Sequence, residues 1–100
     1  MIVGDGSFYY WASQQGKHVA FMHAEEKNDL CIEIFQLVVD GEYKRQGIGS
    51  KLVNHVTKLH PNSTFTVESI GTVEANQFWE SVGFTPAQSY EYLVVYTMET

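Results

Sequence analysis

The sequence predicts a mixed α+β fold, with strands and helices in the order β-β-β-α-β-α-β. The first part of the chain contains three apolar or aromatic stretches of strand length, separated by polar turns. From Ile48 onward the apolar residues recur at helical spacing, and another strand-length stretch follows. A strand-helix-strand crossover places its two strands parallel in one sheet. The predicted sheet is therefore mixed and has helices packed on its faces.

The three N-terminal strands are predicted from aromatic and apolar segments. Residues 7–13 (SFYYWAS) and 17–24 (KHVAFMHA) predict a hairpin across a polar turn that ends in Gly16. The charged residues 25–29 (EEKND) predict a second turn. Residues 30–39 (LCIEIFQLVV) are almost continuously apolar, which indicates a strand that is buried on both faces.

The crossover helix is predicted from a single apolar stripe. The stripe consists of Ile48, Leu52, Val53, Val56 and Leu59. Pro61 ends this helix, because proline cannot continue the backbone hydrogen bonding. Residues 63–68 (STFTVE) then predict the strand that returns to the sheet.

A second helix and a last strand complete the predicted order. Thr72 is suited to cap a helix over residues 73–82, and Gly83 is suited to the position just after its end. Residues 84–86 predict a short bridge. Residues 90–98 (YEYLVVYTM) predict the last strand.

Size, charge and cysteine usage limit the classes of function. One hundred residues predict one domain, residues 1–100. The formal net charge of −6 argues against nucleic-acid binding. We expect no membrane-spanning helix and no signal peptide, because the apolar runs are short and the N-terminus lacks a basic leader. The single cysteine, Cys31, excludes an internal disulfide and favours a reducing, cytoplasmic location.

Residues 43–58 (YKRQGIGSKLVNHVTK) predict an anion-binding turn. The segment contains four of the six lysines and arginines of the chain and no acidic residue. A helix start leaves backbone N–H groups unpaired and has a partial positive charge. Gly47 and Gly49 let an oxygen approach that backbone, and Lys44 and Arg45 add charge at the rim. The turn therefore predicts a phosphate or pyrophosphate cradle.

Two segments resemble motifs of the GNAT family of N-acetyltransferases. Residues 44–49 (KRQGIG) are similar to motif A, Q/R-x-x-G-x-G/A, with Lys44 in place of the usual Gln or Arg. Residues 75–84 (ANQFWESVGF) are similar to motif B, A-x-x-x-Y-x-x-x-G-F. The resemblance covers about residues 7–98 and implies the acyl-CoA N-acyltransferase fold. It implies a minimal member without the N-terminal strand and helix pair of the family, whose acceptor pocket is open or completed by a second subunit in a homodimer.

The resemblance implies acetyl-CoA as the cosubstrate. In the family the glycine turn holds the pyrophosphate, and a bulge in the preceding strand frees a backbone N–H that polarises the thioester carbonyl. Here that strand is residues 33–39. The implied cofactor-binding residues are Leu37, Val38, Val39, Lys44, Arg45, Gln46, Gly47, Ile48, Gly49, Ser50, Asn76 and Trp79.

Two glutamates are candidate general bases, because an amine is protonated at neutral pH and must lose a proton before it attacks. Glu33 stands fourteen residues before Gly47, the offset of the catalytic glutamate in histone-acetylating members of the family. It either acts as the base or faces solvent. Glu68 is the second candidate, and it could equally cap the adjacent loop or bind an acceptor cation.

The proton donor for the leaving thiolate is not identified by the resemblance. Trp79 stands where the family usually has tyrosine, and an indole is not a practical acid. Ser81 and Tyr90 are alternatives. A dedicated acid is dispensable if the thiolate, with a pKa of about 8.5, leaves unaided.

The predicted function is acetyl-CoA-dependent N-acetylation of a primary amine, on a protein lysine or a small molecule. The acidic composition favours a cationic acceptor such as a basic protein. We expect no metal, because the four histidines do not have the spacing of a zinc site. The alternative is a CoA-binding interaction or inhibitor module with little or no turnover, which Trp79 and the missing N-terminal elements favour.

Overall fold

The computed structural model describes residues 2–3, 7–28, 30–44 and 46–100. The described strands are β1 (Ile2–Val3), β2 (Ser7–Gln14), β3 (Lys17–Asn28), β4 (Cys31–Val39), β5 (Thr64–Ser69), β6 (Thr85–Ser89) and β7 (Val94–Glu99). The described helices are the 3-10 helix η1 (Gly41–Tyr43) and the α-helices α1 (Ile48–Leu59) and α2 (Val73–Ser81). Arg45, expected at the rim of the anion cradle, lies outside the described residues.

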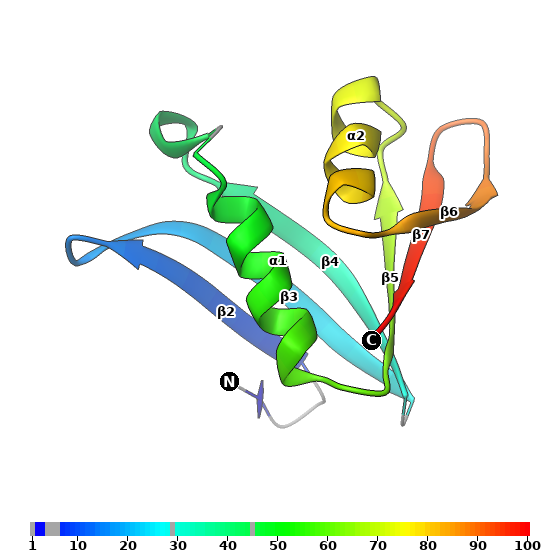
Figure 1. Cartoon of the computed structure of the whole chain (residues 1–100), viewed down its shortest axis with the longest axis horizontal. Helices are drawn as coiled ribbons and strands as arrows, with labels where there is room; N and C mark the ends of the chain where they lie inside the picture. The colour runs from blue at the N-terminus through cyan, green and yellow to red at the C-terminus, as the bar shows by residue number, and fades with distance from the viewer. Residues whose placement is uncertain (1, 4–6, 29, 45) are drawn as a thin grey trace.

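The strands form one mixed sheet in the order β1-β2-β3-β4-β5-β7-β6 (Figure 1). β4 and β5 are parallel and are connected through α1. The other neighbouring strands pair antiparallel. The predicted mixed α+β fold is confirmed, and so is the parallel pair on either side of the first helix.

The turn predicted over residues 25–29 is wrong, because β3 continues through Asn28. The backbone of β3 pairs with β4 as far as Asn28 opposite Cys31. Lys27 on β3 also forms an ion pair with Glu33 on β4, with 3.8 Å between Nζ and Oε1. The chain then reverses direction at Asn28, whose side-chain oxygen accepts a hydrogen bond from the backbone N–H of Leu30 at 3.4 Å.

The C-terminal strands also differ from the prediction. The segment expected to be a short bridge leads directly into β6, an edge strand that pairs with β7. The last strand begins at Val94 instead of Tyr90, because the Tyr90 N–H donates to the Leu93 carbonyl at 2.8 Å and closes a hairpin turn. Pro86 is tolerated in β6 because an edge strand has one side without a strand partner.

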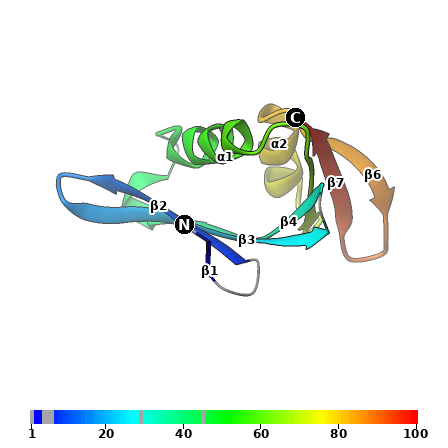
Figure 2. The same cartoon turned by 90° about the horizontal axis from the view of Figure 1, so that it is seen from below.

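Both α-helices pack on the same face of the sheet (Figure 2). Val53 and Val56 from α1 join Trp79 from α2 and sheet residues such as Phe65 and Tyr96 in one hydrophobic cluster. We call the opposite face of the sheet the outer face. Its side chains include the ring-bearing residues Tyr9, Trp11, Phe21, His23 and Phe35, which contact one another across β2, β3 and β4.

β4 and β5 separate part-way along their length (Figure 1). Their parallel pairing runs from Cys31 opposite Thr64 to Ile34 opposite Val67 and then ends. At the same point β4 contains one extra residue relative to β3, Phe35, which forms a β-bulge. A bulge bends its strand and increases the local twist. The edge of β4 that faces β5 therefore has no strand partner from Phe35 onward among the described residues.

Candidate active site

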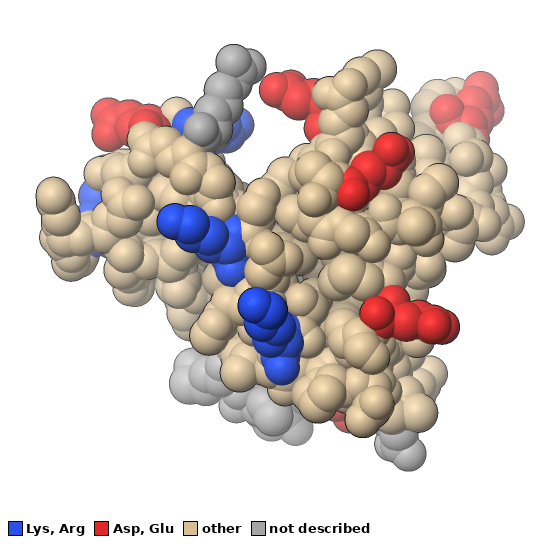
Figure 3. Space-filling view, viewed as in Figure 1, with Lys and Arg blue, Asp and Glu red and all other residues tan. Residues whose placement is uncertain are grey.

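A cleft of about 710 Å³ lies where β4 and β5 separate. Its walls are the end of β4, the segment from η1 into α1, the end of β5 and the first turns of α2. The space-filling view shows a notch between the start of α1 and α2, with basic side chains on the α1 side and acidic side chains on both sides (Figure 3). The cleft is therefore open to solvent at this edge.

The first turn of α1 lies at one end of this cleft. Gly47 precedes the helix with φ of 77°, in the left-handed region that favours glycine, and no side chain caps the helix start. The first helical hydrogen bond runs from the Lys51 N–H to the Gly47 carbonyl at 3.0 Å. The N–H groups of Ile48, Gly49 and Ser50 therefore have no hydrogen-bond acceptor within the helix. All three residues line the cleft. This geometry suits an anion.

Gly49 has a packing role as well as a place in the anion-binding turn. A Cβ atom at this position would lie 3.4 Å from the ring of Phe78 and 3.5 Å from a methyl group of Val39. The position is thus enclosed by α2 and β4 at once. A larger side chain would push α1 away from these two walls of the cleft.

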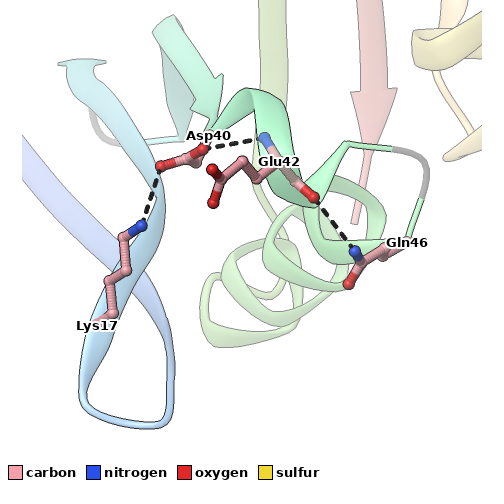
Figure 4. A network of polar contacts seen from close by, with 4 residues as sticks. All are labelled: Lys17, Asp40, Glu42 and Gln46. Atoms are coloured by element: carbon pink, nitrogen blue, oxygen red, sulfur yellow. Dashed lines mark hydrogen bonds and ion pairs between the residues drawn. The ribbon is translucent and has the colours of Figure 1, made fainter.

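The loop before α1 is held by a chain of polar contacts (Figure 4). Asp40 forms an ion pair with Lys17 at 3.7 Å and accepts a hydrogen bond from the Glu42 N–H at 3.0 Å. The Gln46 side chain donates to the Glu42 carbonyl at 3.4 Å. These contacts connect the start of β3 to the residue before Gly47, so they fix the direction in which the chain enters α1.

α2 is fixed at the other side of the cleft by contacts at both of its ends. The Thr72 hydroxyl accepts a hydrogen bond from the Ala75 N–H at 3.1 Å, which confirms the predicted cap. Buried Ser69 donates to the Asn76 side chain at 2.9 Å and so connects α2 to β5. Near the C-terminus of the helix, the Tyr96 hydroxyl donates to Glu80 at 2.6 Å. This hydrogen bond, with burial and the nearby charge, raises the pKa of Tyr96 to about 12.

Trp79 is packed in the core beside the cleft. It is 7% exposed and contacts Phe78 and Phe84 edge-on, with ring centroids 5.0 and 5.2 Å away. It also lines the cleft. Of the two alternative acids, Ser81 donates its hydroxyl to the Phe78 carbonyl at 2.6 Å and Tyr90 is 55% exposed. Neither of these two residues lines the cleft.

The two candidate bases lie on the outer face near the point where the strands separate. In β4, Ile32 and Ile34 are buried toward the helices, so the intervening Glu33 faces the other way. Glu68 likewise alternates with the buried residues of β5. Glu68 lines the cleft, whereas Glu33 does not and is instead paired with Lys27.

Comparison with known proteins identifies the family. A family model described as an acetyltransferase (GNAT) domain matches residues 5–86. The chain belongs to the GNAT family. Among curated relatives, an uncharacterised N-acetyltransferase from Bacillus cereus (strain B4264) is 31% identical over 55 residues, which are 55% of this chain and 32% of that relative. The chain spans about a third of the length of the curated relatives that it matches.

Solved GNAT structures share this fold. The ribosomal-protein-S18-alanine N-acetyltransferase of Escherichia coli superposes with a TM-score of 0.78 at 24% identity, over 96% of this chain and 69% of that one. The PaiA N-acetyltransferase of Thermoplasma acidophilum, solved in complex with coenzyme A, gives a TM-score of 0.84 at 13% identity, over 95% and 62%. Arabidopsis thaliana Naa50, solved with a bisubstrate analogue, gives 0.78 at 20% identity, over 92% and 72%.

Most of the cofactor-binding residues that the GNAT motifs predict lie around this one cleft. Those that line it are Leu37, Val38, Val39, Lys44, Gly47, Ile48, Gly49, Ser50 and Trp79. Gln46 and Asn76 do not line it. Their side chains form hydrogen bonds with Glu42 and Ser69. The bulge lies at Phe35 instead of at residues 37–39, which pair with β3 in regular register.

Several lining residues were not predicted from the sequence. Phe35, Tyr43, Ser69, Glu74 and Phe78 contribute to the cleft walls. The GNAT motif B could have indicated Phe78, since it directly precedes Trp79 on the same helix. Tyr43 begins the predicted anion-binding turn, whereas Phe35, Ser69 and Glu74 have no local signal in the sequence.

No group of three or more histidine, cysteine, aspartate or glutamate side chains suited to a metal ion occurs within the described ranges. Among the same residues, no helix is long and apolar enough to cross a membrane.

Proposed function

We propose that the chain is an acetyl-CoA-dependent N-acetyltransferase that acts on a primary amine, either a protein lysine or a small cationic molecule. The observation that supports this proposal is the cleft between β4 and β5, which has unpaired helix-start amides at one end and an unpaired strand edge along one wall. These are the two backbone features that a diphosphate and a thioester carbonyl require.

In this proposal the donor enters from the helix side. The pyrophosphate binds the N–H groups of Ile48, Gly49 and Ser50, and Lys44 adds positive charge. The pantetheine arm extends along β4, where Leu37 and Val39 give an apolar wall. The thioester carbonyl accepts a hydrogen bond from the free edge of β4 near the bulge. An amide that is already in place and shielded from water stabilises the developing oxyanion without reorganisation.

The acceptor enters from the outer face, where both candidate bases lie. Glu68 lines the cleft and makes no ion pair with any residue that the structure describes, so we assign it the role of general base. It removes a proton from the ammonium, and the amine then attacks the thioester carbon. Glu33 is the alternative base. Its carboxylate faces Lys27 instead of the cleft.

The leaving thiolate needs no dedicated acid in this scheme. Trp79 offers an indole and no hydroxyl, and it is buried against other rings. The attacking nitrogen loses a second proton as the amide forms, and the thiolate of coenzyme A takes up one proton. A thiolate with a pKa of about 8.5 is a tolerable leaving group under these conditions.

The proposed function is tested by coenzyme A binding and by thiol release. We expect calorimetry to show binding of acetyl-CoA to the purified chain, and a thiol assay with a panel of primary amines to show release of coenzyme A. Gly49→Val should weaken binding at least tenfold, because its side chain meets Phe78 and Val39 and displaces the helix start. Gly41→Ala is the matched control, since a Cβ there meets open space. No binding by a folded wild-type chain would overturn the proposal.

A second function is favoured by the burial of Trp79. A GNAT-fold module that binds coenzyme A but turns over slowly would keep the cleft and dispense with a tyrosine at this position. It predicts the same calorimetric binding with no thiol release from any amine in the panel. Trp79→Tyr separates the two functions, because restored turnover in this variant would show that the proton donor was the missing part.

A further inference from the structure

We propose that Lys27 is a self-acetylation site, whose amine receives the acetyl group of acetyl-CoA bound in the same chain. The inference rests on the proposed function, because it needs a thioester in the β4–β5 cleft. It goes beyond that function by naming one acceptor nitrogen within the protein. The side chain of Lys27 is 43% exposed, on the outer face near the end of β3.

The ammonium of Lys27 lies among three side chains of the outer face. Its Nζ is 3.8 Å from Oε1 of Glu33 and 3.8 Å from Oε1 of Glu25. It also lies 4.6 Å from the centroid of the Phe35 ring, where a cation is attracted by the π face. One group thus has a carboxylate within a short distance to take a proton and an aromatic surface that orients it.

Two of these neighbours connect Lys27 to the cleft. Phe35 is the bulged residue of β4 and lines the cleft, so the ring under the ammonium belongs to the residue at which the strand edge becomes free. Glu33 directly precedes Ile34, the last residue of β4 that pairs with β5. The amine of Lys27 thus contacts the side chain of the bulged residue, next to which the proposed function places the thioester carbonyl.

The reaction balances with acetyl-CoA as the only co-reactant. Glu33 takes one proton from the ammonium of Lys27, directly after a small side-chain rotation or through one water molecule. The nitrogen lone pair forms a C–N bond to the thioester carbon, and the C–S bond then breaks. The second nitrogen proton goes to the thiolate. The products are the acetyl amide of Lys27, free coenzyme A and one released proton.

Acetylation changes the acceptor face. The modified side chain has no charge, so it loses its attraction for Glu25, Glu33 and the ring of Phe35. The carboxylates of Glu25 and Glu33 can then bind an acceptor cation without competition from the ammonium of Lys27. We expect acetylated protein to bind cationic amines more tightly than unmodified protein.

The experiment follows acetylation of each lysine by site-resolved mass spectrometry after incubation with acetyl-CoA. We expect Lys27 to be modified at least tenfold faster than Lys17, Lys51 or Lys58, at a rate per molecule that does not change with protein concentration. Lys27→Arg should abolish the main product. Lys58→Arg is the control, because Lys58 is an exposed lysine in the last turn of α1 and does not line the cleft.

Two further variants distinguish enzymatic from spontaneous modification. Glu33→Gln should slow acetylation of Lys27 at least tenfold while leaving coenzyme A binding unchanged, and Gly49→Val should slow it by impairing that binding. Equal modification of all exposed lysines, or a rate that rises with protein concentration, would overturn the inference. If external amines are acetylated while Lys27 is not, the inference fails and the proposed function stands. Absence of coenzyme A binding would reject both.

Discussion

Glu68 and Glu33 show how two similar residues acquire different roles from their surroundings. Both face outward from neighbouring strands, and Glu33 lies opposite Thr66, two residues before Glu68 along β5. Only Glu68 lines the cleft, and only Glu33 has a lysine within ion-pair distance. Glu68 is therefore suited to serve an external amine, whereas Glu33 serves Lys27.

Substitution of Glu68 tests this assignment. Glu68→Gln keeps the shape of the side chain and removes the base, so kcat/KM for an external amine should fall about a hundredfold or more. The measurement is the pH dependence of thiol release. The rise in rate that accompanies deprotonation of the base in the wild type should be absent in Glu68→Gln. Glu33→Gln is the matched control and should change the external reaction less than threefold. A larger loss in Glu33→Gln than in Glu68→Gln would transfer the role to Glu33.

At the scale of elements, α2 is connected to β7 by one short hydrogen bond. The Tyr96 hydroxyl and Glu80 are 2.6 Å apart, and the bond favours the protonated phenol. The contact keeps α2 beside the end of β5, where Ser69 and Asn76 form the second connection. Together these bonds fix one wall of the cleft relative to the sheet.

This contact predicts a loss of stability at alkaline pH. The pKa of Tyr96 is about 12 in the folded chain and near 10 in an unfolded one. Its contribution is therefore complete below about pH 10 and is lost as the pH rises toward 12. Urea unfolding followed by tryptophan fluorescence should show the free energy of unfolding fall across this interval.

Two variants serve as controls for this pH dependence. Tyr96→Phe should be less stable than the wild type at neutral pH and should show a shallower fall above pH 10. Part of the fall should persist, since burial also raises the pKa of Tyr10. Tyr92→Phe should behave like the wild type, because Tyr92 is 79% exposed. Identical slopes in the wild type and Tyr96→Phe would contradict the prediction.

At the scale of the whole molecule, a short parallel ladder joins two parts of the sheet. β1 to β4 lie on one side and β5, β7 and β6 on the other, and the residues from Cys31 to Ile34 make the only described strand pairing between them. The cleft begins where this ladder ends. A ligand in the cleft therefore contacts both parts at once.

Coenzyme A should stabilise the folded chain as a whole. At a hundredfold excess over Kd, a ligand that binds only the folded state adds about 2.7 kcal/mol to the free energy of unfolding. Thermal unfolding should shift upward accordingly. Hydrogen exchange should slow at residues 35–39 and 68–70 and stay unchanged in the hairpin turn at residues 14–17. Protection confined to that turn would contradict binding in the cleft.

The local sequence was enough to predict the two α-helices, five of the strands, the parallel crossover and the glycine turn, whereas β1, η1 and β6 were not predicted. The predicted features depend on local periods, caps and backbone freedom, which neighbouring residues specify. The strand ends were less predictable. The polar residues 25–28 have the composition of a turn, but they form the end of β3 because their backbone pairs with β4. β6 has weak local strand propensity and is held by its pairing with β7.

The position of the bulge, the lining of the cleft and the ion pair of Glu33 became known from the folded arrangement of the strands. Phe35 became the point of separation because β4 has one residue more than β3 can match and β5 stops pairing with it there. Glu33 and Glu68 then differ through neighbours that are distant in sequence. The physical reason is that these properties arise from register between strands, and no local pattern of one strand contains the register of its partner.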